Sequence, residues 1–399
     1  MTHAHDHAAA YRVDPGTRRL LTIALVPLAA LTVVALALLW PTGEDTSFSA
    51  IFGEPDERID ATVEDVEEGP CEGTPEAAGV RCATVAVRID EGPDDGDIVV
   101  LPEQPVGGSF PELSRGDGVV LGFAPEAGPG FQYYFADLQR RFPLLVLGAV
   151  FAAAVIALGR WKGLRALFGV VLSLLVLVQF ALPSLLEGSE PVAVALAASA
   201  AIAFAALYLA HGLNVRTSTA LLGTLASLAL TGVLAAVFIA ATDLTGLSSE
   251  EAQFLQVSAG QVDLRGLLLA GVIVGTLGVL DDVTVTQVSA VWELRRANPA
   301  YGVVDLYRSA VNIGRDHIAS TVNTLVLAYA GASLPLLLLF TQSGQGLGDV
   351  LTGEIVAQEV VRALVGSVGL VASVPLTTLL AALVVSRHRP VEPKPSLLR

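Results

Sequence analysis

Two adjacent aspartates, Asp281 and Asp282, lie in an otherwise apolar part of the sequence. They follow the almost wholly apolar run Leu267–Leu280 and precede ten uncharged residues that end at Trp292. A helix over the first run alone would be about 21 Å long, short of the roughly 30 Å hydrocarbon core of a bilayer. We therefore expect the helix to continue to Trp292, with both aspartates a little past its midpoint. The alternative is a short helix that ends before Asp281 and leaves both carboxylates at the membrane surface.

Matching polar residues occur on the next apolar segment. Asp316, Ser320 and Asn323 recur at the spacing of one helix face, and His317 lies beside that face. A charged side chain at the centre of a bilayer costs roughly 2.5–3.5 kcal/mol on insertion scales, so buried carboxylates there indicate a function. The candidate ion-binding residues on the two segments are Asp281, Asp282, Thr286, Gln287, Asp316, His317, Ser320 and Asn323.

These residue types favour a hard cation. Oxygen atoms of carboxylates, amides and hydroxyls are the ligands that Mg²⁺, Ca²⁺ and Mn²⁺ prefer. The sequence thus predicts a bound divalent cation, and no other cofactor, with the metal ligands Asp281, Asp282, Asp316 and Asn323. Carboxylates beside a histidine can also relay protons. The apolar segments contain no cysteine and the single methionine is Met1, which argues against transport of a soft metal such as copper.

Two further polar clusters stand out. A secondary polar site is expected between two other apolar segments, at His211, Asn214 and Arg216. The amino-terminal stretch alternates histidines around an aspartate, at His3, His5, Asp6 and His7. Alternate histidines on a flexible tail can hold a transition metal weakly, although an unstructured polar tail is the simpler interpretation.

The elements that must position these residues are apolar helices. The chain has 399 residues, 16% charged, and a mean hydropathy of +0.63, which is typical of a polytopic membrane protein rather than a soluble one. A transmembrane helix needs about 20 predominantly apolar residues. Eight runs approach or exceed this length: Leu20–Trp40, Phe142–Leu158, Leu167–Leu186, Pro191–Leu209, Thr217–Ala241, Leu267–Val291, Ile318–Phe340 and Val360–Val385. The first is too long for a typical signal peptide, so we interpret it as a retained anchor helix.

Basic residues set the expected orientation. Cytoplasmic loops of membrane proteins collect Lys and Arg, and with both termini inside, all eight segments alternate in agreement with this rule. The predicted organisation is a cytoplasmic tail over residues 1–19, a first transmembrane helix over 20–40, an external segment over 41–141, a seven-helix membrane domain over 142–386 and a cytoplasmic tail over 387–399.

The external segment is acidic and predicted to be a β-domain. Residues 41–141 contain 22 acidic and 6 basic residues, and therefore carry the whole formal net charge of −16. Alternating runs such as "ATVAVRID" and "RGDGVVLG" predict strands of a small barrel or sandwich. Outside the cytoplasm the two cysteines, Cys71 and Cys82, are expected to form a disulfide. The acidic surface could concentrate cations, but a merely solvated surface explains it as well.

Several long stretches resemble one known family. "HGLNVRTSTALLGTL", "GTLGVLDDVTVTQVSAVWEL", "IGRDHIASTVNTLVLAYAGASLPLLLLF" and "VGLVASVPLTT" are similar to the YibE/F-like family of bacterial multipass membrane proteins. The resemblance implies a multipass protein of eight helices in the bacterial plasma membrane, with an external module after the first helix. The family itself is known chiefly as uncharacterised, with transport suggested.

Three classes of function are compatible with the sequence. A transporter or channel for a small inorganic cation, with proton coupling as an option, fits the polar residues of the sixth and seventh segments best. The sequence has no G-x-x-x-x-G-K-[ST] loop, so ATP-driven transport by this chain alone is not expected. An intramembrane aspartyl hydrolase would need Asp316 to share a proton with Asp281 or Asp282. The third class is a non-catalytic scaffold or sensor. The expected partners are the bilayer and an inorganic ion, without nucleic acid, and a homo-oligomer is compatible with the sequence.

Overall fold

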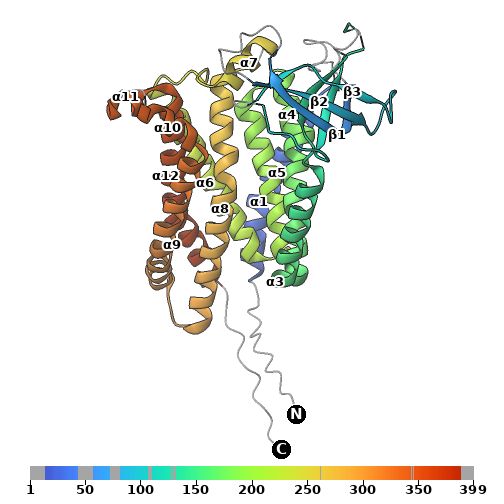
Figure 1. The fold of residues 1–399 in the computed structure, drawn as a ribbon. Helices are drawn as coiled ribbons and strands as arrows, with labels where there is room; N and C mark the ends of the chain where they lie inside the picture. Colours follow the sequence, from blue (N-terminus) through green and yellow to red (C-terminus); the bar gives the residue numbers. More distant parts are fainter. Residues whose placement is uncertain are drawn as a thin grey trace, which may run out of the picture. The chain divides into compact units, whose positions relative to one another are not determined.

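The computed structural model divides the chain into two compact units, residues 1–46 with 155–399, and residues 47–154. The structure describes residues 14–43, 57–71, 81–106, 110–125, 127–128, 132–260, 262–342, 344 and 346–387. The amino-terminal histidines and all of the carboxy-terminal tail after Arg387 lie outside these residues. Figure 1 shows the helices and the strands with the labels used below.

The first unit is helical. Its helices, with α3 crossing the division between the units, are α1 (Pro15–Leu38), α3 (Arg141–Val176), the π-helix η2 (Leu177–Ala181), α4 (Leu182–Leu186), α5 (Pro191–His211), α6 (Val215–Ala241), α7 (Glu250–Ser258), α8 (Leu264–Ala297), α9 (Val303–Ala332), α10 (Leu334–Gln342), α11 (Leu347–Thr352) and α12 (Glu354–Ser386). The start of α1 and the end of α12 lie at one end of this bundle, and α7 lies at the other (Figure 1).

Many of these helices are long and apolar enough to cross a membrane. Among the described residues six qualify, or seven if α9 and α10, which meet at a bend of 63°, form one span. One of the six, Arg141–Leu186, has 46 residues, about twice the length that a bilayer needs. Arg160 interrupts it with a left-handed conformation, φ 51° and ψ −130°. A Cβ on Gly163 would overlap the carbonyl of Val155, so the chain folds back there.

The break at Arg160 falls between the second and third predicted segments, which end at Leu158 and begin at Leu167. The sequence therefore placed this reversal correctly, because the charged residues that follow Arg160 interrupt the apolar run. The count of eight spans stays a prediction, because helix length and composition give six or seven among the described residues.

Small residues and threonines fit together where α6, α8 and α12 pack. A Cβ on Gly223 of α6 would lie 2.5 Å from the Oγ1 atom of Thr377 on α12. The same contact occurs in reverse, because a Cβ on Gly369 of α12 would overlap the hydroxyl of Thr231 on α6. Thr231 donates its hydroxyl to the carbonyl of Ser227, one turn earlier. Close contacts of small residues are typical of the packing between membrane helices.

Two loops of the helical unit are held by a glutamate and a Thr–Gly pair. After α1, Glu187 accepts hydrogen bonds from the backbone N–H groups of Thr42–Gly43, at 2.8 and 2.9 Å. After α6, Glu354 accepts from the backbone N–H groups of Thr245–Gly246, at 2.7 and 3.0 Å. In both places the threonine hydroxyl adds a third bond. We name these arrangements the first latch (Thr42, Gly43, Glu187) and the second latch (Thr245, Gly246, Glu354).

The second unit is built on an antiparallel sheet, as its alternating sequence predicts. Its described strands are β1 (Glu57–Pro70), β2 (Arg81–Ile89), β3 (Ile98–Val100), β4 (Gln104–Pro105), β5 (Gly118–Phe123) and β6 (Tyr133–Leu138). The order is β3-β2-β1-β5-β6, with β4 also paired to β2. Alternate residues of β1 and β2, such as Ile59, Val63 and Val87, are buried in one apolar cluster.

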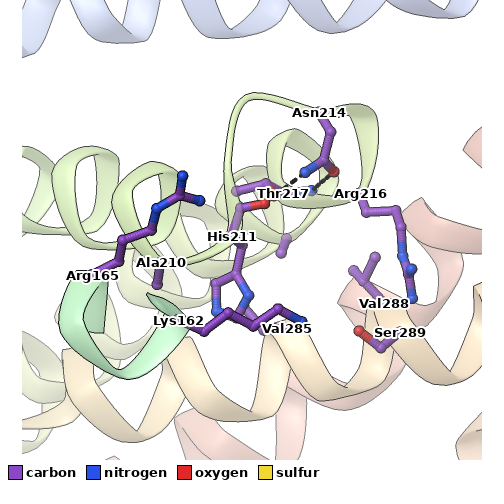
Figure 2. A pocket seen from close by; sticks show the side chains of 11 residues that line it. Lys162, Arg165, Ala210, His211, Asn214, Arg216, Thr217, Val285, Val288 and Ser289 are labelled. Atoms are coloured by element: carbon purple, nitrogen blue, oxygen red, sulfur yellow. Dashed lines mark hydrogen bonds between the residues drawn. The ribbon is translucent and has the colours of Figure 1, made fainter. Parts of the chain in front are cut away.

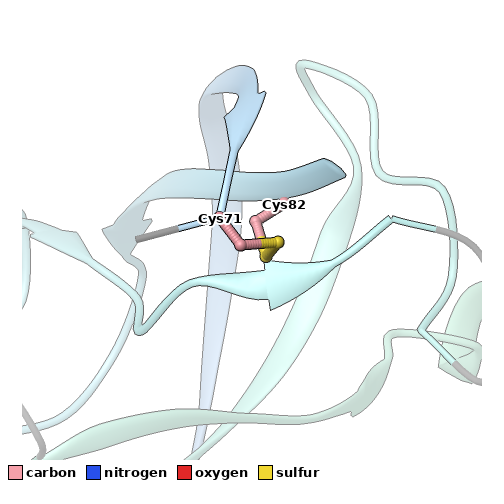
Figure 3. Close-up of a disulfide and its surroundings, with 2 residues drawn as sticks. All are labelled: Cys71 and Cys82. Atoms are coloured by element: carbon pink, nitrogen blue, oxygen red, sulfur yellow. A yellow bond between two sulfur atoms is a disulfide. The ribbon is translucent and has the colours of Figure 1, made fainter. Parts of the chain in front are cut away.

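The predicted disulfide is present. Cys71 follows β1 and is bonded to Cys82 in β2, which pairs with β1 (Figure 3). The bond therefore closes the connection between two hydrogen-bonded strands.

Candidate cation-binding site on α8 and α9

The two aspartates lie in the middle of a continuous helix. α8 has 34 residues and runs from Leu264 to Ala297, capped at its start by the carboxylate of Asp263. The interpretation in which the helix ends before Asp281 is therefore wrong. The helix continues past Asp282 because the residues from Val283 to Trp292 include no charged residue and no proline.

The two carboxylates have different surroundings. Asp281 is half-buried, and its Oδ1 atom is buried with no hydrogen-bond partner in the described structure. Asp282 is 71% exposed, and its Oδ2 atom lies 3.9 Å from the Nε2 atom of His317 on α9. That nitrogen is also buried and makes no hydrogen bond. The α8–α9 interface thus places the imidazole of His317 beside Asp282, and Asp281 is the preceding residue of α8. We call these three residues the acidic cluster.

The neighbouring turn of α8 is fixed by hydroxyls. Thr284 is fully buried, its hydroxyl lies 2.6 Å from that of Thr224 on α6, and it donates to the carbonyl of Asp281 at 3.1 Å. These contacts hold the backbone of the aspartate pair against α6. Thr224 was not anticipated from sequence, because a single threonine in an apolar helix is most often a packing residue.

Gln287 joins three helices. Its Nε2 atom donates to the carbonyl of Ala310 on α9 and to the hydroxyl of Thr378 on α12, each at 2.7 Å. Thr378 in turn donates to the carbonyl of Val374. Gly314 lies so close that a Cβ there would be 2.8 Å from the Oε1 atom of Gln287. Both amide hydrogens are therefore used within the protein. A cation would bind the Oε1 atom instead, so the ion-binding role of this side chain stays a prediction.

Other predicted ligands are not gathered with the cluster. Asp316, Ser320, Asn323 and Thr286 are exposed. Successive residues of a helix point about 100° apart, so when His317 faces α8 its neighbour Asp316 turns away. Within the described part of the chain no three side chains of His, Cys, Asp or Glu converge on a possible metal position. The predicted metal set Asp281, Asp282, Asp316 and Asn323 thus does not form a closed cage here.

The residues of the predicted secondary site, in contrast, lie close together. His211, Asn214 and Arg216 line one pocket at the junction of α5 and α6. The side chain of Asn214 caps α6 by accepting from the backbone N–H of Thr217 at 3.0 Å, and it donates to the carbonyl of His211 at 2.8 Å. Asn214 therefore shapes the turn, and His211 and Arg216 are left to face the pocket.

Comparison with known proteins agrees with this architecture. The family model for YibE/F-like proteins matches residues 147–387, more than half of the chain. The chain belongs to the YibE/F-like family. No curated protein and no solved structure matches it. The match includes the acidic cluster and the α5–α6 pocket, and it excludes α1 and all of the described strands.

Proposed function

We propose that this YibE/F-like protein is a secondary transporter or channel for a hydrated divalent cation of the Mg²⁺ or Mn²⁺ type, with protonation of the acidic cluster coupled to cation binding. The observation that carries the proposal is the unpaired, buried carboxylate oxygen of Asp281 in the middle of a long apolar helix. A buried carboxylate is costly unless a counter-charge, a proton or a metal neutralises it. Asp282, the next residue of α8, and His317, which lies 3.9 Å from Asp282, are neighbouring groups that could share either one.

The incomplete ligand set favours a cation that passes through. Mg²⁺ keeps several of its waters and is commonly bound through one or two carboxylates, whereas Ca²⁺ takes six to eight oxygen ligands. Conduction also requires a site from which the ion can leave. Asp281 and Asp282, one half-buried and one open, suit a partly hydrated ion, and a protonated His317 would oppose its binding.

The proposed membrane arrangement has eight spans in the bacterial plasma membrane with both termini cytoplasmic. The break at Arg160 and the distribution of basic residues support it. The two latches add a second argument, because their Thr–Gly pairs follow the first and fifth predicted spans and their glutamates precede the fourth and eighth. A constant offset of four spans is what a parallel internal repeat produces, and repeats of this kind are common in secondary transporters.

The hydrolase alternative has less support. A shared-proton dyad needs two carboxylates in contact, and the α9 residue that faces Asp282 is His317 rather than the exposed Asp316.

Flux in liposomes tests the proposal. Asp281→Asn and Asp282→Asn keep side-chain size and remove charge, and each should reduce uptake of Mg²⁺ or Mn²⁺ by about tenfold or more, as the loss of a charged ligand implies. The matched control is Asp263→Asn, on the same helix, where asparagine caps as well as aspartate. Flux at wild-type rates in both cluster variants would overturn the proposal. An imposed pH gradient should change the wild-type rate and leave His317→Gln less responsive.

A further inference from the structure

A pocket of about 370 Å³ lies where α5 turns into α6, and basic side chains line it. Its polar lining comes from α3, α5, the turn, α6 and α8: Lys162, Arg165, His211, Asn214, Arg216, Thr217 and Ser289. Figure 2 shows Lys162, His211 and Arg216 turned toward the pocket from three different elements, with Arg165 at one side. Lys162, Arg165 and Arg216 carry positive charge and donate hydrogen bonds, and a neutral His211 keeps one N–H donor, so together these groups suit an anion.

The positive charge of the pocket is only partly balanced. Arg216 lies 3.6 Å from Glu293, which also pairs with Arg296 at 3.0 Å. Lys162 and Arg165 form no ion pair with any residue that the structure describes. One carboxylate therefore serves two arginines, and two further cations stand at the pocket without a protein counter-charge.

Hydrogen bonds and a glycine fix the conformation of the turn between α5 and α6. Gly212 adopts φ 78°, a conformation that costs glycine little, and Asn214 bonds the chain on both of its sides. Thr217 is buried beneath the turn. The pocket is thus shaped by the α5–α6 junction itself and does not depend on a loop closing over it.

A groove of about 590 Å³ shares Asn214 with this pocket, and aliphatic side chains line it together with the polar side chains of Thr22, Tyr208 and Ser218. α1 supplies Leu21, Leu25 and Val26, the turn supplies Leu213 and Asn214, and Asn214 is common to both cavities. Arg18 stands at the groove as well. A cationic pocket next to a groove that is partly lined by aliphatic side chains matches the two parts of a phospholipid.

We propose that the α5–α6 pocket binds a phosphate group, and that the adjoining groove makes an anionic phospholipid its source. Arginine and lysine are the residues that recognise phosphate in proteins, arginine through its fork of donors and lysine as a point charge. Cytoplasmic leaflets carry the anionic lipids, and the pocket lies on the predicted cytoplasmic side. The proposal does not rest on cation transport, because none of its residues belongs to the acidic cluster.

Topology alone would also place basic residues near this end of the helices. In that explanation only the charge matters, so removing basic residues inside or outside the pocket should weaken lipid binding equally. Specific binding predicts unequal effects, and this difference is what the experiment measures.

The test uses the full chain purified in detergent, with phosphatidylglycerol, phosphatidylcholine or inorganic phosphate added in separate arms. Binding is measured by native mass spectrometry and by the shift of the unfolding midpoint. Phosphatidylglycerol should bind the wild type, and Lys162→Gln with Arg165→Gln should weaken binding by about tenfold or more. The matched control, Arg308→Gln with Arg387→Gln, removes the same charge on the same predicted side and should bind like the wild type.

Each outcome decides something. Equal loss in the pocket and control variants would overturn the proposal in favour of general surface charge. Protection by inorganic phosphate alone, lost in the pocket variant, would keep the phosphate site and replace the lipid as its source. If the double variant unfolds without ligand, the two single variants Arg165→Gln and Lys162→Gln are tested instead. Binding of phosphatidylglycerol at the wild-type level in both single variants would also contradict the proposal.

Discussion

The two latches have the same chemistry and different surroundings. Gly43 and Gly246 both adopt a left-handed conformation, with φ of 77° and 82°. A Cβ on Gly43 would meet nothing within 4 Å, whereas one on Gly246 would lie 2.6 Å from the carbonyl oxygen of Leu264, in the first turn of α8. The second latch is therefore packed against the helix that carries the acidic cluster, and the first is open.

The same contrast holds for the segments that follow the latches in chain order. The second predicted span, residues 142–158, contains no acidic residue and no histidine, whereas the sixth, residues 267–291, contains Asp281 and Asp282. The proposed repeat would therefore have the acidic cluster in its second half only. Predictions that treat the halves as matched pairs test this division directly.

The largest difference is expected between Gly246→Ala and Gly43→Ala. A left-handed alanine costs about 1–2 kcal/mol at either position. At Gly246 the clash with Leu264 should add about 1–3 kcal/mol, as overpacking does elsewhere. Thermal unfolding of the two purified variants in one detergent measures the difference. Equal midpoints would mean that the second latch is as open as the first.

A smaller difference is expected between Glu354→Gln and Glu187→Gln. One oxygen of Glu354 accepts three hydrogen bonds from Thr245 and Gly246, whereas Glu187 divides its three bonds between two oxygens. Glutamine keeps an acceptor oxygen but loses the charge that strengthens the bonds. Glu354→Gln should lower the unfolding midpoint more than Glu187→Gln. The reverse order would show that the first latch carries more of the stability.

The smallest effect concerns pH at the first latch. Hydrogen bonds from the backbone of Thr42 and Gly43 lower the pKa of Glu187 below its usual value. A lowered pKa in the folded state gives stability that is complete above the unfolded pKa, about 4.3, and is lost as pH falls through the folded pKa.

The stability difference between wild type and Glu187→Gln should therefore be constant at neutral pH and shrink below about pH 4. Unfolding curves at stepped pH measure it, with Glu190→Gln as a neighbouring control. A difference that grows as the pH falls would contradict the assignment.

The sequence by itself determined the features that depend on neighbouring residues. Apolar runs predicted the helices and the reversal near Arg160, alternation predicted the strands, and the two cysteines predicted the disulfide. The acidic cluster was also visible, because Asp281 and Asp282 interrupt an apolar helix and His317 begins a polar line on the next one. Periodicity reports which residues share a face of one element, and these features need nothing more.

Tertiary structure decided which faces meet. The sequence could not show that Gln287 donates hydrogen bonds to Ala310 and Thr378. Nor could it show that Asp316 is exposed while His317 faces Asp282. It gave no sign of the latches, whose partners lie more than a hundred residues apart, nor did it place Lys162 in one pocket with Arg216. The physical reason is that the rotation and depth of each helix are fixed by close contacts with other helices, such as Gly223 against Thr377, and no local pattern encodes that match.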